Sequence, residues 1–137
     1  MSQVSTRSGS RIDGYVGSVL SAGLPLLSRI ALSAVFVLSG AGKLAAPAAT
    51  LDLIASAGLP FVWLAYAGSV LVELVGGSAL IVGYRTRSVA LVLAVFSLAT
   101  AIVFHSNFAD QNQLVHFLKN IAMFGGLLHV VALGPDR

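Results

Sequence analysis

The chain has 137 residues, of which 57% are hydrophobic and 9% are charged, whereas soluble domains contain about 25% charged residues. This composition, with a mean hydropathy of +0.93, excludes a water-soluble globular protein and predicts one all-α membrane domain. The net charge of +3 comes from scattered basic residues, which does not indicate nucleic-acid binding, and the absence of cysteine excludes iron–sulfur clusters, covalent haem attachment and thiol chemistry.

The N-terminal part of the chain divides into a polar stretch and a first apolar segment. Residues 1–23 are rich in serine, glycine and arginine and predict a flexible polar tail. The apolar segment begins at Leu24 and Pro25, where proline suits the first turn of a helix, and continues to about residue 44. A signal peptide also combines an early arginine with a short apolar core, although residues 41–46 (AGKLAA) would make a poor cleavage region.

Three more apolar segments follow the first one. The connection at residues 45–60 predicts a loop around a short amphipathic helix that is capped near Thr50. The sequence therefore predicts an integral membrane four-helix bundle, which occupies residues 24–134. The predicted spans are residues 24–44, 61–83, 88–107 and 113–133.

The arginines predict how this bundle is oriented. Four spans place both termini on one side of the membrane, and every arginine falls on that side, whereas the opposite loops contain none. The topogenic arginines are Arg7, Arg11, Arg29, Arg85 and Arg87, joined by Arg137 at the C-terminus. Because positively charged residues are retained in the cytoplasm, we expect both termini to be cytoplasmic.

Three charged residues fall inside the predicted spans. At about 1.5 Å per residue, Glu73 lies roughly 18 Å below Phe61, near the middle of a hydrocarbon core about 30 Å thick. Lys43 and Lys119 lie in the half of the core nearer the arginine-free loops. A charge at the bilayer centre costs about 2.5–3.5 kcal/mol, so we expect Glu73 to form an ion pair with Lys43 or Lys119.

Further polar residues share helical faces with these charges, at spacings of three and four residues. Such faces predict a polar site between the helices, where an excess positive charge suits an anion or the carbonyl group of a quinone-like molecule. The alternative is a purely structural ion pair that fixes helix register. The candidate ligand-binding residues are Ser39, Lys43, Ser69, Glu73, His105, Lys119 and Asn120.

The three histidines have a simpler interpretation. His105 and His116 border the charged layer, but a metal site requires three or four converging ligands, so no metal site is expected. His129 falls near the end of the last span and is expected to be a histidine of the membrane interface or a satisfied core residue.

Several motifs resemble those of the DoxX family of small four-helix bacterial membrane proteins. The matching segments, in the order of the family, are SRIALSAVFVLSGAGKL, AGLP, VELVGGSALIVGYRTR, LATAIVFH and FLKNIAMFGGLL, and the similarity covers about residues 25–133. The family has no agreed catalytic set, so the resemblance supports a shared site without defining a reaction. Its patterned polar positions correspond here to Arg29, Lys43, Glu73, Arg85, Arg87, His105, Lys119 and Asn120.

The resemblance implies a multi-pass protein of the bacterial inner membrane. Relatives are linked with quinone-coupled oxidation of sulfur compounds and with assemblies that protect against oxidative stress. We therefore expect a subunit or accessory of a membrane oxidoreductase system, which binds a quinone or a small sulfur anion and acts with soluble or membrane redox partners, or as a homo-oligomer, rather than alone. The alternative is a transporter, ligand binder or assembly scaffold without catalysis, and the sequence does not separate the two.

Overall fold

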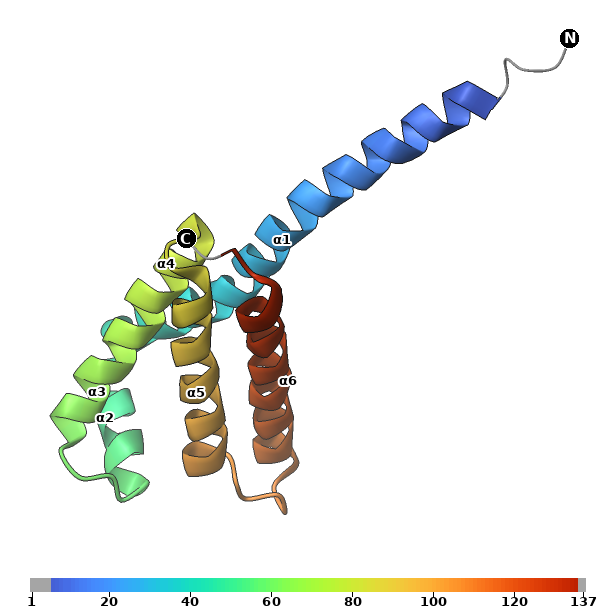
Figure 1. Ribbon diagram of the computed structural model, residues 1–137. Coiled ribbons are helices and arrows are strands. Elements are labelled where there is room, and N and C mark those ends of the chain that lie inside the picture. The colour runs from blue at the N-terminus through green and yellow to red at the C-terminus, as the bar shows by residue number, and fades with distance from the viewer. Residues whose placement is uncertain (1–5, 136–137) are drawn as a thin grey trace, which may run out of the picture.

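The computed structural model describes residues 6–135, and this part of the chain is all-helical (Figure 1). Four stretches are long and apolar enough to cross a membrane, which confirms the four-helix membrane fold. The second of them is divided into three elements, and a short helix precedes it. The elements are α1 (Thr6–Ala45), α2 (Pro47–Ser56), α3 (Val62–Leu71), η1 (Val72–Gly76), α4 (Gly77–Val82), α5 (Thr86–Phe104) and α6 (Gln111–Leu133).

The first helix is longer than the sequence predicted. Helix α1 begins at Thr6 and runs without a break through Pro25 to Ala45, so residues 6–23 are helical where an irregular tail was expected. The reason is that apolar side chains recur among the polar ones at helical spacing from Ile12 onward, a periodicity that the serine and glycine content obscures. The predicted tail residues 1–5 lie outside the described part of the chain.

The short helix α2 was predicted correctly, but its predicted cap was wrong. Ala46 is the N-cap residue and Pro47 occupies the first helical turn, where the missing proline N–H removes no hydrogen bond. Thr50 lies inside the helix, and its hydroxyl donates to the carbonyl oxygen of Ala46 over 3.3 Å.

Both described ends of the chain lie at the same end of the bundle, which we call the terminal end (Figure 1). Helices α5 and α6 form an antiparallel hairpin, and η1 and α4 lie between α1 and α5. Near the terminal end, Arg29 lies against Gly83, and Arg87 donates to the carbonyl oxygen of Gly134 over 2.8 Å. The arginines Arg29, Arg85 and Arg87 therefore share one end, and their cytoplasmic location stays a prediction; Arg137 lies outside the described residues.

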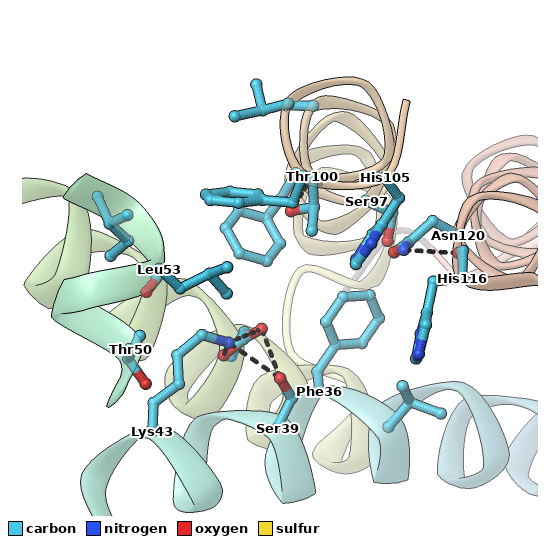
Figure 2. A pocket seen from close by; sticks show the side chains of 18 of the residues that line it. Phe36, Ser39, Lys43, Thr50, Leu53, Ser97, Thr100, His105, His116 and Asn120 are labelled. Carbon is cyan, nitrogen blue, oxygen red and sulfur yellow. Dashed lines mark hydrogen bonds and ion pairs between the residues drawn. The ribbon is translucent and has the colours of Figure 1, made fainter. Parts of the chain in front are cut away.

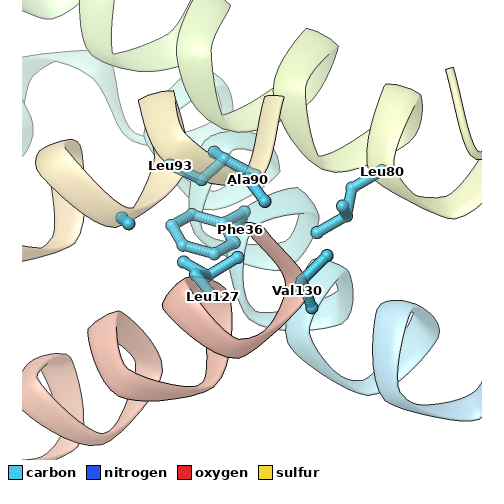
Figure 3. Close-up of a cluster of buried hydrophobic side chains, with 7 residues drawn as sticks. Phe36, Leu80, Ala90, Leu93, Leu127 and Val130 are labelled. Carbon is cyan, nitrogen blue, oxygen red and sulfur yellow. The ribbon is translucent and has the colours of Figure 1, made fainter. Parts of the chain in front are cut away.

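The hydrophobic core also lies toward the terminal end. Its buried members pack around the ring of Phe36 (Figure 3). The cluster consists of Phe36, Leu80, Ala90, Leu93, Ala94, Leu127 and Val130. It joins α1, α4, α5 and α6, so one cluster holds all four spans together at this end.

Two glycines allow α1 to approach the second span closely. A Cβ atom on Gly77 would lie 2.9 Å from Cγ2 of Val37 and 3.3 Å from Cβ of Phe36. A Cβ atom on Gly40 would lie 2.8 Å from Cγ of Leu74. Small residues of this kind are the usual means by which membrane helices come into backbone contact.

The start of α6 is fixed by Asp110, which gives a first testable prediction. A carboxylate oxygen of Asp110 accepts hydrogen bonds from the backbone N–H groups of Asn112, over 2.8 Å, and Gln113, over 3.4 Å. Replacement of Asp110 by alanine should lower the free energy of unfolding by about 1 kcal/mol, measured by circular dichroism in detergent micelles. Asp110→Asn is the control, because asparagine caps equally well; an equal loss in both variants would contradict a capping role.

Candidate intramembrane binding site

A cavity of about 600 Å³ opens between the helices at the end opposite the core. Apolar side chains from α1, α2, α5 and α6 form most of its wall, including Phe36, Leu53, Phe96 and Met123. Figure 2 shows polar side chains on two facing walls, with Lys43 and Ser39 on one and Ser97, His105 and Asn120 on the other. The arrangement is that of a ligand pocket, in which a few polar groups interrupt an apolar lining.

The first polar wall is built on an ion pair. Nζ of Lys43 lies 2.6 Å from Oε2 of Glu73, whose residue is only 4% exposed. The hydroxyl of Ser39 donates to Oε1 of Glu73 over 3.0 Å, and Nζ of Lys43 also donates to the Ser39 hydroxyl over 2.9 Å. These contacts confirm the predicted pairing of Glu73 with a lysine and join α1 to the second span.

Glu73 lies in a wide π-helical turn rather than in regular α-helix. This turn, η1, interrupts a span that the sequence predicted as one helix. It begins directly after α3 and ends at Gly76, which is followed by Gly77. π-Helical turns inside α-helices occur frequently at functional sites. The irregular backbone and the buried carboxylate of Glu73 therefore both indicate the same candidate site.

The second polar wall contains a buried hydroxyl that has no partner. Ser97 is 1% exposed and lines the cavity, and its Oγ atom forms no hydrogen bond with the described residues. A buried hydroxyl without a partner is unfavourable unless something else satisfies it. Ser97 is not among the candidate residues named from the sequence, although its four-residue spacing from Ala101 and His105 was an available signal.

Two stacked histidines close this wall. The rings of His105 and His116 lie 5.0 Å apart at an interplanar angle of 21°. Nδ1 of His105 donates to Oε1 of Gln113 over 3.0 Å, which leaves Nε2 of a neutral ring as an acceptor. The amide of Asn120 donates to the carbonyl oxygen of His116 over 3.0 Å.

The structure brings all seven candidate binding residues to the wall of this cavity. They do not form one network, however. Lys119 lines the cavity and is exposed, with no ion pair to a described residue, whereas Lys43 is neutralised by Glu73. Ser69 donates its hydroxyl to the carbonyl oxygen of Tyr66 over 2.8 Å. The cavity therefore has near it one positive charge, that of Lys119, which pairs with no described residue, in agreement with the single excess charge that the sequence predicted.

The described residues contain no group of three or more His, Cys, Asp or Glu side chains arranged to hold a metal ion. His129 is exposed and does not line the cavity. The polar groups that line the cavity offer hydrogen-bond donors, hydrogen-bond acceptors and charge.

Comparison with known sequences explains this architecture. The model of the family described as DoxX matches residues 24–106, which include both ends of the Lys43 and Glu73 ion pair. The chain belongs to the DoxX family. Among the relatives of this DoxX protein, Inner membrane protein YqjF of Escherichia coli (strain K12) is 37% identical over 110 residues, covering 80% of this chain and 83% of the relative.

A second relative leads to the same conclusion. Inner membrane protein YphA of Escherichia coli (strain K12) is 28% identical over 117 residues, covering 82% of this chain and 84% of the relative. With four apolar helices able to span a bilayer, these relatives identify the DoxX protein as a multi-pass protein of the inner membrane. No solved structure matches the chain.

Proposed function

We propose that this DoxX protein binds a quinone-like molecule in the cavity, as a subunit or accessory of a membrane oxidoreductase or oxidative-stress system. The buried hydroxyl of Ser97 is the main support, because Ser97 lines a ligand-sized cavity and its hydroxyl has no hydrogen-bond partner among the described residues. A quinone carbonyl would accept that hydrogen bond. The quinone, when bound, would supply two-electron redox chemistry that the chain itself lacks.

The cavity favours a quinone-like ligand over a small sulfur anion. Ligand cavities of about 300–1,000 Å³ suit molecules much larger than an inorganic anion, and the volume here is about 600 Å³. An anion would also have to leave water for mostly apolar walls, and among the described residues that line the cavity only the exposed Lys119 would be a free counter-charge. A flat ring with an apolar tail matches both the walls and the polar ends.

Each polar group has a role that follows from its contacts. Ser97 and Asn120 are donors on one wall, and Lys43 is a donor on the other, held in place by Glu73 and Ser39. With its Nδ1–H held by Gln113, His105 can offer Nε2 as a hydrogen-bond acceptor. These residues would orient the carbonyl groups of a quinone ring.

A titration tests the binding. Purified full-length protein in lipid nanodiscs should bind a short-chain ubiquinone, measured by isothermal titration calorimetry. Ser97→Ala should weaken binding about tenfold, since a lost hydrogen bond is worth about 0.5–1.5 kcal/mol. Ser33→Ala is the matched control, because Ser33 is also buried with an unpartnered hydroxyl but does not line the cavity.

The outcomes separate the ligand classes. Binding of thiosulfate with no binding of ubiquinone or a short-chain menaquinone would show that the cavity binds a sulfur anion and not a quinone. Equal affinities of the Ser97→Ala and Ser33→Ala variants for ubiquinone would show that Ser97 does not contact the ligand. If Glu73→Gln retained full electron transfer to quinone in membranes, the redox assignment would fail, and a ligand-binding or transport role without catalysis would replace it.

A further inference from the structure

The first part of α1 has no packing partner within the described chain. At about 1.5 Å per residue, its 40 residues make a helix about 60 Å long, twice the thickness of the hydrocarbon core. Figure 1 shows that the N-terminal half projects away from the bundle. A Cβ atom on Gly14, Gly17 or Gly23 would meet no other atom within 4 Å, so nothing in the described chain covers this half.

This projecting half nevertheless carries an apolar stripe. Its large apolar side chains recur at spacings of three and four residues, which places them on one helical face. Each of them is between 47% and 72% exposed. The stripe consists of Ile12, Tyr15, Val16, Val19, Leu20 and Leu24. The opposite face carries Arg11, Ser18 and Ser21, so the two faces differ strongly in polarity.

The apolar stripe continues into the lipid-facing surface of the span. Leu27 and Ile30 lie on the same face and are exposed on the membrane-spanning part of α1. One face of the membrane-spanning part of α1 contacts the acyl chains. If α1 bends away from the bundle where it leaves the bilayer, the same face of the projecting half lies against the membrane surface. Pro25 lies at this point and lacks the N–H that would bond to the carbonyl oxygen of Ser21, which favours such a bend.

From this arrangement we infer that residues 11–24 form an interfacial helix that lies on the bilayer surface, with Ile12, Val16 and Leu20 among the acyl chains. Arg11, on the polar face, reaches lipid phosphates. Tyr15 has the amphipathic ring typical of the membrane interface. A helix with one apolar face and an arginine on the other is the usual form of such an element.

Single cysteines test the inference, since the chain has none of its own. Spin labels are attached to the full-length Val16→Cys and Ser18→Cys variants in nanodiscs of phosphatidylethanolamine and phosphatidylglycerol. Collision rates with oxygen, which enriches in lipid, and with a water-soluble nickel chelate are then measured. Leu38→Cys, at an exposed apolar position of the span, and Ala109→Cys, in the loop before α6, provide the lipid and water standards.

The collision rates of the label at residue 16 should resemble those of the lipid standard. The collision rates of the label at residue 18 should resemble those of the water standard. Adding Leu20→Asp should raise the collision rate of the residue-16 label with the nickel chelate several-fold. The melting temperature should not change, because residue 20 contacts no other helix of the described chain. Free access of nickel to both labels would mean that the helix projects into water. Shielding of residue 16 from both reagents would mean that a second copy covers it. Either result would overturn the inference.

Discussion

Replacing Lys43 by methionine is expected to destabilise the protein by about 3–5 kcal/mol, because a buried carboxylate is left without its counter-charge. Glu73 is 4% exposed, so water cannot take the place of the lysine without entering the cavity. Among the described residues, only the hydroxyl of Ser39 would remain as a hydrogen-bond partner of this carboxylate. The measurement is reversible unfolding in mixed micelles, followed by circular dichroism.

Two further variants identify the cause of this loss. The double variant Lys43→Met with Glu73→Met should recover to within about 1–2 kcal/mol of the native protein, since a buried ion pair is often replaceable by apolar side chains of similar size. Lys119→Met is the matched control and should change stability by less than about 1 kcal/mol, as Lys119 is exposed and forms no ion pair with a described residue. A double variant as unstable as Lys43→Met alone would show that the lysine stabilises by some other contact.

Replacing Gly77 by valine is expected to destabilise the protein by about 1–3 kcal/mol or more, because overpacking at a close contact forces backbone shifts. The new Cβ would lie 2.9 Å from Cγ2 of Val37 and 3.4 Å from the carbonyl oxygen of Ser33. Helix α1 would have to move away from α4, and the ion pair between Lys43 and Glu73 would be strained with it. The same unfolding experiment measures the effect.

Gly125→Val provides the matched control for this prediction. Both glycines lie within helices, so the difference in helix propensity between glycine and valine applies to both variants. A Cβ atom on Gly125 would meet no atom within 4 Å, so this change should be close to neutral. Equal destabilisation by the two substitutions would show that the close approach at Gly77 is not responsible.

The sequence predicted the number of spans, and the approximate limits of the last three, because these depend on composition over about 20 residues. It also predicted that Glu73 would meet a lysine, since an isolated charge inside hydrocarbon is costly. It could not decide between Lys43 and Lys119. That choice depends on which helices are neighbours, and α1 reaches η1 through the close contact at Gly40.

The features that were missed have different physical causes. The π-helical turn at Val72–Gly76 changes the backbone without changing the hydrophobic pattern, so no periodicity reveals it. The site role of Ser97 depends on whether a neighbouring atom satisfies its hydroxyl, which only the packing determines. The helical stretch before Leu24 was overlooked because polar and glycine residues on one face concealed the apolar stripe on the other.

The uneven distribution of packing along the bundle has a mechanical consequence. The cluster around Phe36 fastens all four spans near the terminal end, whereas the opposite end encloses a cavity of about 600 Å³. A small change in the tilt of one helix would therefore alter the width of the cavity more than it would disturb the packing around Phe36.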